Sequence, residues 1–304
     1  MEMIELSVII CTYNPNAERL NRTLAGLRNQ TLALNKWELI IIDNNSSTAV
    51  SVDTNWHPNS SIIPEPKAGL TYARLKGFSR AVGQIMVLVD DDNILDENYL
   101  LNTLKILNTH PKIGAIGGKI LPEFEETPPT WLNQFYSLLA IRDEGDSEII
   151  SEGDKQYPKA APVGAGMAIR KAAVNSYITK VNKNNSPVTD RQGSSLSSGG
   201  DNDLVMEVVK QGWQVGYFPS LSLTHIIPAG RIQADYLAQL NYSSNKSWIK
   251  VLQNHNINPW PKIAAWTVAL RKAKAWFAYK AWIKPVNYIK WRGACGMFEA
   301  LAND

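Results

Sequence analysis

Three consecutive aspartates, Asp90, Asp91 and Asp92, follow an apolar run in the stretch VLVDDDNIL (87–95). Like charges this close repel one another, so something must offset them. Mg²⁺ and Mn²⁺ prefer oxygen ligands and are often held by one or two carboxylates together with substrate phosphates. Because alternate residues of an extended segment point the same way, we expect Asp90 and Asp92 to share such an ion. The alternative is that the triplet only opens a turn and caps the next helix.

Alternating strands and helices in the first part of the chain must position this triplet. Short apolar runs rich in β-branched residues predict the strands, and leucines at helical spacing predict the helices between them. The expected strands are 6–11, 37–43, 85–90 and 113–118, and the expected helices are 17–30, 69–83 and 96–110. Such an alternation indicates an α/β fold with a mostly parallel sheet covered on both faces.

Polar clusters follow three of these strands: TYN at 12–14, DNNSS at 43–47 and DDDN at 90–93. In an open α/β sheet, ligands bind beyond the carboxyl ends of the strands. We therefore expect the three clusters to meet at one edge of the sheet, which favours a metal and phosphate site over simple capping.

The composition excludes several other classes of protein. The 304 residues are 44% hydrophobic, enough for one large or two smaller domains, and the net charge of +3 gives no sign of nucleic-acid binding. Cys11 and Cys295 form neither a disulfide framework nor a zinc motif, which fits a reducing cytoplasm. We expect no export signal and no membrane-spanning helix.

Six sequence blocks resemble family 2 glycosyltransferases, in the order of that family and over roughly residues 5–230. The blocks are SVIICTYN (7–14), IIDNNSS (41–47), KAGLTYARLKG (67–77), VLVDDDN (87–93), GAGMAIRK (164–171) and GGDNDLVMEVVKQGW (199–213). The resemblance implies a GT-A fold, a nucleotide-sugar donor, a divalent metal cofactor (Mn²⁺ or Mg²⁺) and inversion at the anomeric carbon.

The resemblance also assigns donor-binding residues, block by block. It puts Thr12 and Asn14 at the nucleotide, Tyr13 near its base and Asp43 at the base or ribose. The further substrate-binding residues that it implies are Lys67, Gly69, Arg74, Asp91, Gly166, Asp203 and Arg231. Two alternatives stay open, because Asp43 can simply cap its own turn and Arg74 can be a solvated helix residue.

Asp201 in GGDNDL matches the catalytic base of the family. In an inverting transfer, a carboxylate takes the proton of the acceptor hydroxyl as that oxygen attacks the anomeric carbon. Asp203 is the second candidate, and either residue can also support the start of the helix that runs to Gly212. The glycine-rich stretch SSLSSGGD (194–201) is expected to flex and admit substrate.

LTHIIPAGR (223–231) contains the last expected site residues. By the resemblance, His225 contacts the metal or the diphosphate, so we group it with Asp90 and Asp92 as a metal ligand. Arg231 then neutralises the leaving diphosphate, a role that suits the guanidinium group. A structural role for the lone histidine is the alternative.

The C-terminal part of the chain is basic and aromatic, with no Asp or Glu from residue 236 to residue 298. A helix is expected over 265–284, where lysine and arginine alternate with tryptophan and aliphatic residues. Such a helix suits an anionic membrane surface. The alternatives are a helical cap packed on the catalytic domain and, less favoured, a nucleic-acid site.

Taken together, the sequence predicts a GT-A catalytic domain over 1–230, with a nucleotide-sugar-binding half at 1–118 and an acceptor half at 119–230, and a helical extension over 231–304. The predicted activity is an inverting, metal-dependent hexosyl transfer from a UDP-sugar to a saccharide or lipid-linked acceptor, in the cytoplasm near a membrane. The alternatives are a non-catalytic sugar-nucleotide-binding protein and a sugar nucleotidyltransferase.

Overall fold

The computed structural model describes residues 3–152, 156–183, 196 and 199–302. The chain divides into two compact units. The first unit consists of Met1–Glu123, Ala140–Pro187 and Leu204–Ile226. The second unit consists of Phe124–Leu139, Val188–Asp203 and Ile227–Asp304. These units are defined by which residues contact one another in space. The boundaries expected at 118 and 230 divide the chain by function, so they stay a prediction.

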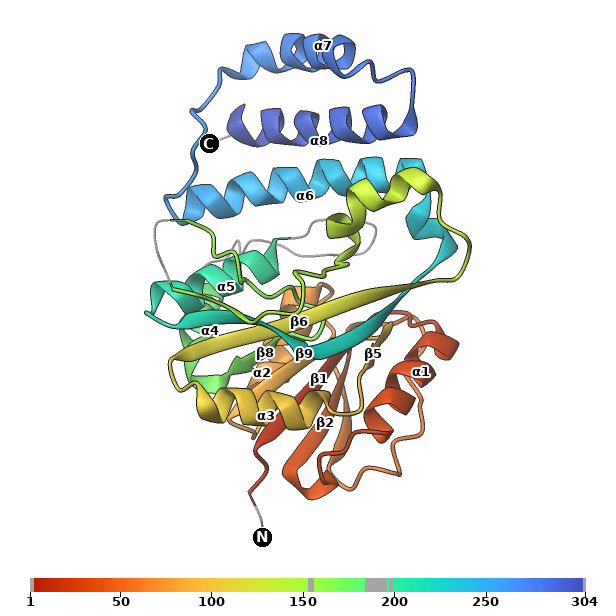
Figure 1. The fold of residues 1–304 in the computed structure, drawn as a ribbon, viewed down its shortest axis with the longest axis vertical. Helices are drawn as coiled ribbons and strands as arrows, with labels where there is room; N and C mark the ends of the chain where they lie inside the picture. Colours follow the sequence, from red (N-terminus) through yellow and green to blue (C-terminus); the bar gives the residue numbers. More distant parts are fainter. Residues whose placement is uncertain (1–2, 153–155, 184–195, 197–198, 303–304) are drawn as a thin grey trace. The chain divides into compact units, whose positions relative to one another are not determined.

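A nine-stranded sheet, as far as the chain is described, forms the centre of the first unit (Figure 1). Its order is β3-β2-β1-β4-β8-β6-β9-β5, and β7 pairs with β9. The strands are β1 (Leu6–Thr12), β2 (Trp37–Asp43), β3 (Ser60–Pro64), β4 (Ile85–Asp90), β5 (Asn93–Leu95), β6 (Ile113–Phe124), β7 (Ile149–Ser151), β8 (Ala168–Arg170) and β9 (Gln214–Ile227).

The sheet is mixed. β1 pairs in parallel with β2 and with β4, and β2 with β3, whereas β8 pairs antiparallel with both β4 and β6, and β9 pairs antiparallel with β5 and β7. Helices α1 (Ala17–Arg28) and α2 (Leu70–Arg80) supply the crossover connections that parallel strands need. The expected α/β class is confirmed, with its parallel part confined to β3-β2-β1-β4.

Both faces of the sheet are buried under helices. On β1, Val8 belongs to a core cluster that also contains Leu24 of α1 and Leu104 of α3 (Tyr99–Thr109). The next residue, Ile9, belongs to a second cluster with Phe78 of α2, and α4 (Lys171–Lys183) and α5 (Gly200–Lys210) pack there too. Successive side chains of a strand point to opposite faces, so an unbroken apolar run such as that of β1 is buried on both.

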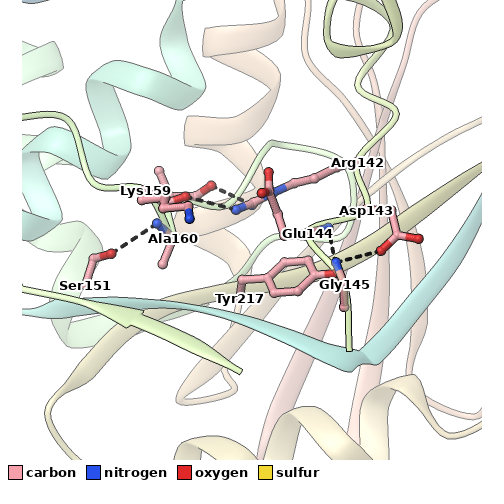
Figure 2. A network of polar contacts seen from close by, with 9 residues as sticks. Arg142, Asp143, Glu144, Gly145, Ser151, Lys159, Ala160 and Tyr217 are labelled. Atoms are coloured by element: carbon pink, nitrogen blue, oxygen red, sulfur yellow. Dashed lines mark hydrogen bonds and ion pairs between the residues drawn. The ribbon is translucent and has the colours of Figure 1, made fainter. Parts of the chain in front are cut away.

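A polar network links residues 142–145 and 159–161 to β9 in the first unit (Figure 2). The Arg142 guanidinium donates to the carbonyl oxygens of Ala161, at 2.6 Å, and of Lys159, at 3.2 Å. The Tyr217 hydroxyl of β9 donates to the carbonyl of Gly145 at 3.0 Å, and the guanidinium carbon of Arg142 lies 5.0 Å from the centre of the Tyr217 ring. Burial lowers the pKa of Arg142, although neighbouring Glu144 opposes the shift. These side-chain contacts therefore help to hold residues 142–145 and 159–161, which precede the GAGMAIRK block.

Helices make up the second unit. They are η2 (Thr130–Leu139), η3 (Ala229–Ile232), α6 (Ala234–Asn254), η4 (Ala265–Thr267), α7 (Val268–Tyr279) and α8 (Pro285–Ala302), and the first unit adds the short η1 (Leu34–Lys36). α8 lies between α6 and α7 (Figure 1). Gly296 allows the close approach of α8 to α6, because a Cβ atom there would lie 2.1 Å from the Tyr242 carbonyl oxygen.

The prediction of one continuous helix over 265–284 is wrong. α7 ends at Tyr279, and Lys280 adopts the left-handed conformation (φ 51°) that commonly ends a helix. Its backbone N–H donates to the Phe277 carbonyl, and a turn follows before Pro285 begins α8. Within the described residues, no helix has the length and apolarity needed to span a membrane.

Candidate active site

The carboxyl ends of β1, β2 and β4 lie side by side, as expected for the three polar clusters. The strand register aligns Thr12 with Asp43, and Cys11 with Asp90. The backbone N–H of Asn44 donates to the Thr12 carbonyl at 2.9 Å, which continues the pairing beyond β2. The TYN, DNNSS and DDDN clusters therefore meet at one edge of the sheet.

The aspartate triplet is not extended, contrary to expectation. Asp90 ends β4, Asp91 and Asp92 form a turn, and Asn93 begins β5. The Thr12 hydroxyl donates to the carboxylate of Asp91, which joins β1 to the turn. Alternation along a strand is thus the wrong reason for pairing Asp90 with Asp92, and their shared metal stays a prediction.

Asn93 organises this turn and was missed by the sequence reasoning, although it ends the DDDN cluster. Its side chain is fully buried. Its Oδ1 accepts from the backbone N–H of Asp90 at 3.2 Å, and its Nδ2 donates to Oδ1 of Asp92 at 3.1 Å. A buried amide that binds both ends of the triplet offsets part of the repulsion between its charges.

His225 of β9 lies beside Asp92, with its Nε2 atom 3.4 Å from Asp92 Oδ1. β5 and β9 form an antiparallel pair in which His225 is opposite Asn93, and the backbone N–H of Ile226 donates to the Asp92 carbonyl at 2.9 Å. The imidazole is 4% exposed and the Asp92 side chain 15%. Two of the three expected metal ligands are therefore neighbours.

No cluster of three or more His, Cys, Asp or Glu side chains suited to a metal ion occurs in the described residues. The pair of Asp92 and His225 nevertheless fits a hard divalent cation in its chemistry. Mg²⁺ and related ions keep several waters and bind through one or two protein groups together with substrate phosphates. A site with two protein ligands at this edge is consistent with an ion whose remaining ligands come from the substrate and water.

Arg74 of α2 is buried, at 4% exposure, so the alternative of a solvated helix residue is wrong. It lies near the Cys11 thiol, whose surroundings also include Asp90 and Asp91. Burial raises the pKa of Cys11 to about 12; the positive charge of Arg74 opposes the shift, and the two aspartates add to it. Cys11 is therefore a protonated, unreactive packing residue, and Arg74 brings a positive charge close to the triplet.

Asp43 holds the loop after β2. Its two carboxylate oxygens accept from the backbone N–H of Ser46 at 3.1 Å and of Val50 at 3.0 Å. Burial raises the pKa of Asp43, but the hydrogen bonds from Ser46 and Val50 outweigh this effect and hold the pKa below its usual value. The carboxylate caps its turn and stays ionised, and a second role at the nucleotide stays a prediction.

Asn44 is a second organising residue that the sequence reasoning missed, although it lies in the DNNSS cluster. Its buried side chain donates to the Lys67 carbonyl at 2.8 Å and accepts from the Gly69 N–H at 2.7 Å. Gly69 adopts φ 130°, and the Lys67 ammonium lies 3.8 Å from the centre of the Tyr72 ring. The KAG block is thereby held against the end of β2.

The two other members of the TYN cluster face outward. Tyr13 is 50% exposed. Asn14 has a left-handed backbone (φ 48°), and its Oδ1 accepts from the backbone N–H of Ser47 at 2.8 Å. An exposed aromatic ring beside an ordered asparagine leaves a flat apolar surface available to a planar ligand.

Gly166 is required by close packing. It has φ 76°, and a Cβ atom there would lie 2.6 Å from the Tyr99 hydroxyl oxygen and 2.5 Å from a Leu223 methyl group. That hydroxyl donates to the Gly166 carbonyl at 2.6 Å. The sequence predicts a substrate contact here, and the observed contacts are structural.

Asp201 and Asp203 lie in the first turn of α5 and belong to the second unit. Asp201 is partly exposed, whereas the side chain of Asp203 is 3% exposed. Oδ1 of Asp203 lies 2.8 Å from Nε2 of His255, which directly follows α6, and the His255 side chain is equally buried. The SSLSSGGD stretch includes 194–195 and 197–198, which lie outside the described residues.

His255 is the third residue that the sequence reasoning missed, and no motif or spacing signals it. Arg231, also in the second unit, donates from Nε to the Tyr236 hydroxyl at 3.2 Å. The described contacts thus tie Asp203 and Arg231 to α6 within this unit.

Comparison with known proteins decides the family. The model of "Glycosyl transferase family 2" matches residues 7–177, which is more than half of the chain and includes every donor-side block described above. The chain belongs to glycosyl transferase family 2. A 160-residue stretch of this family 2 chain is 23% identical to the glucosyl-dolichyl phosphate glucuronosyltransferase of Haloferax volcanii. The match covers 51% of this chain and 50% of that protein, so the chain spans about half the length of this curated relative.

Solved structures of TarS from S. aureus are similar to this family 2 chain. TarS 1–349 in complex with UDP has a TM-score of 0.53 at 12% identity, and the match covers 98% of this chain and 90% of that one. A second TarS structure has a TM-score of 0.52 at 13% identity, covering 95% of this chain and 55% of that one. At this identity the likeness concerns the fold, and together with the mixed sheet and flanking helices it confirms the expected GT-A fold.

Proposed function

We propose that the chain transfers a hexose, with inversion, from a nucleoside-diphosphate donor to a saccharide or lipid-linked acceptor. One observation carries the proposal: Asp92 and His225 are adjacent, 3.4 Å apart, at the sheet edge where Thr12 contacts Asp91. This edge is where open α/β sheets bind ligands, and carboxylate and imidazole groups suit a metal that holds phosphates.

The donor is proposed to be a UDP-sugar. Exposed Tyr13 offers a face to the base, and the ionised Asp43 offers acceptor oxygens to the base or ribose. The likeness of the fold to TarS in complex with UDP supports uridine as the base. Lys67, which precedes α2 and contacts Asn44 after β2, and Arg74 within α2 add positive charge, which favours an anionic donor.

Asp92 and His225, with Asp90, are the proposed ligands of Mn²⁺ or Mg²⁺. When bound, such an ion neutralises the diphosphate and makes it a better leaving group. The protein's own part is to hold the carboxylate of Asp92 in place through Asn93 and to keep the triplet near Arg74. Arg231 is proposed to add a second positive charge on the leaving diphosphate.

Asp201 is the proposed base. As the acceptor oxygen forms its bond to the anomeric carbon, the bond to the diphosphate oxygen breaks and the carboxylate of Asp201 takes the hydroxyl proton. The partial exposure of Asp201 supports this role, because a base must reach the acceptor. Asp203 is buried against His255, which supports a positioning role for it.

The relative from Haloferax volcanii is named a glucosyl-dolichyl phosphate glucuronosyltransferase, which supports a lipid-linked acceptor for this chain and therefore work near a membrane. A sugar-nucleotide-binding protein without activity would bind donor but show neither transfer nor donor hydrolysis. A sugar nucleotidyltransferase would instead release pyrophosphate from a nucleoside triphosphate.

The test compares Asp201→Asn with Asp203→Asn, after a thermal-shift screen of nucleotide sugars with Mn²⁺ has identified the donor. We expect Asp201→Asn to keep donor affinity and to slow transfer by about 10²–10⁴-fold. Asp203→Asn, the same change two positions along α5, is expected to slow transfer by less than about tenfold. Fast transfer by Asp201→Asn with a dead Asp203→Asn variant would move the base to Asp203. No donor binding or turnover of the native chain with any sugar nucleotide would refute the proposed function.

A further inference from the structure

Helix α7 exposes a row of apolar side chains. In a helix on a protein surface, apolar residues normally face the core and polar residues face water. In α7, Leu270 and Phe277 are each 68% exposed, Ala273 between them is exposed too, and the buried residue is Ala275 on the opposite side. Leu270, Ala273 and Phe277 follow the spacing i, i+3, i+7, so they share one face of the helix.

The segments on either side of α7 extend this face. Trp266, one helical turn before Leu270, is 82% exposed, and Trp282 and Ile283 after the helix are each 54% exposed. The Trp282 ring packs edge-on against Phe277, with 5.8 Å between ring centres. We name Trp266, Leu270, Ala273, Phe277, Trp282 and Ile283 the apolar stripe.

The other face of α7 is fixed to α8, so the apolar stripe is held outward. The Trp291 indole N–H donates to the Lys272 carbonyl at 3.0 Å, and the Trp276 and Trp291 rings meet edge to face at 4.7 Å. Lys272 Nζ lies 2.5 Å from Glu299 of α8. Large apolar side chains that gather on an exposed surface generally mark an interaction site.

Positive charge surrounds the apolar stripe. Arg271 and Lys274 lie on α7, and Lys280 and Lys284 follow it; all four are exposed. No Asp or Glu occurs in the sequence from residue 236 to residue 298. A partner that covers this surface must therefore supply both negative charge and an apolar interior.

We propose that the apolar stripe binds the interfacial region of an anionic lipid bilayer. Tryptophan rings prefer the depth of the lipid headgroups, leucine and phenylalanine side chains enter the acyl boundary, and lysine and arginine pair with lipid phosphates. A second copy of this chain fits poorly, because its stripe would bring the same positive charges opposite these. The inference rests on the membrane location proposed above and names the surface responsible for it, but its test requires neither a donor nor transfer, so the two proposals can fail separately.

Flotation of the full chain with vesicles tests the proposal. We expect binding to phosphatidylcholine vesicles with about a third phosphatidylglycerol, weak binding to phosphatidylcholine alone, and at least about tenfold weaker binding when salt rises from about 0.05 M to about 0.5 M. Absence of binding to the anionic vesicles at low salt would overturn the proposal.

Two pairs of variants identify the surface. The double variant Leu270→Ser with Phe277→Ser is expected to weaken vesicle binding at least about tenfold, whereas Val82→Ser, at another exposed apolar position (54%), leaves it unchanged. Lys274→Glu with Lys284→Glu is expected to abolish the preference for anionic lipid, and Lys105→Glu, at an exposed position of α3, is its control. Circular dichroism checks that each variant is folded.

Two outcomes contradict the inference even if the native chain binds vesicles. Equal binding by the Leu270/Phe277 variant and the Val82 control would place the lipid contact elsewhere. A dimer in size-exclusion chromatography that this variant dissociates, combined with unchanged vesicle binding, would assign the stripe to contact between copies of the chain.

Discussion

Glu299 connects the three long helices of the second unit, so its replacement by glutamine tests what holds α7 in place. The Glu299 carboxylate on α8 accepts from Lys272 of α7 at 2.5 Å, from Lys246 of α6 at 3.1 Å, and from the Tyr242 hydroxyl of α6. Glu299→Gln keeps the size of the side chain and removes its negative charge. In this variant, Lys246 and Lys272 lose the carboxylate to which both of them donate.

The loss of folding stability expected for Glu299→Gln follows from the pKa of the Glu299 carboxyl group. Burial raises the pKa of Glu299, but the hydrogen bonds from Lys272, Tyr242 and Lys246 outweigh it and bring the pKa from its usual 4.5 to about 2. A lowering of this size corresponds to about 3 kcal/mol of stability at neutral pH. The side chain is 26% exposed, so solvent and salt screen the interaction, and we expect about 1–2 kcal/mol for Glu299→Gln.

The lowered pKa also determines how the stabilisation by Glu299 changes with pH. The folded-state pKa of Glu299 is depressed, so its contribution is fully present above about pH 4.5 and is lost as the pH falls toward about 2. The native chain and Glu299→Gln should therefore differ most at neutral pH and converge in acid. Denaturant titration followed by tryptophan fluorescence measures this, since seven of the ten tryptophans lie in the second unit.

Glu126→Gln is the matched control, because Glu126 is an exposed glutamate of the same unit. It should leave the free energy of unfolding unchanged within about 0.5 kcal/mol. The reasoning is refuted if Glu299→Gln is as stable as the native chain at pH 7, or if the difference between them persists undiminished near pH 2.

Two further predictions concern the candidate site. Titration calorimetry should show that Asp92→Ala weakens UDP binding at least about tenfold with Mn²⁺ present and only slightly with a chelator, whereas Asp96→Ala, at an exposed position, should change neither affinity. Equal UDP binding by Asp92→Ala and the native chain in Mn²⁺ would return the triplet to a capping role. His255→Leu and Asp203→Asn are each expected to lower the free energy of unfolding by about 1–3 kcal/mol, and a double-mutant cycle should give a coupling above about 0.5 kcal/mol; additive losses would mean that their 2.8 Å contact contributes nothing.

The sequence alone determined the elements and the edge that they share. β2 and β4 have the expected bounds of 37–43 and 85–90, because unbroken apolar runs and helical leucine spacing are local signals. It also determined that TYN, DNNSS and DDDN meet, since parallel strands joined by crossover helices end at the same edge. Six ordered blocks were enough to predict the family, and the family was confirmed.

Tertiary structure alone decided which side chains pair. Asp92 meets His225 because β5 pairs with β9, and Asp203 meets His255 because the end of α6 reaches the start of α5; neither pairing has a signature in spacing. The conformation of the triplet also follows from contacts, because the buried side chain of Asn93 binds a turn where local reasoning expected a strand.

The orientation of α7 was decided in the same way. Its sequence has apolar side chains on two faces, one with Trp276 and Ala275 and one with Leu270 and Phe277, so periodicity cannot choose the face that packs. The contact of Trp276 with Trp291 makes that choice and leaves Leu270 and Phe277 exposed. Local periodicity fixes where a helix forms, whereas the face that it buries depends on partners distant in the chain.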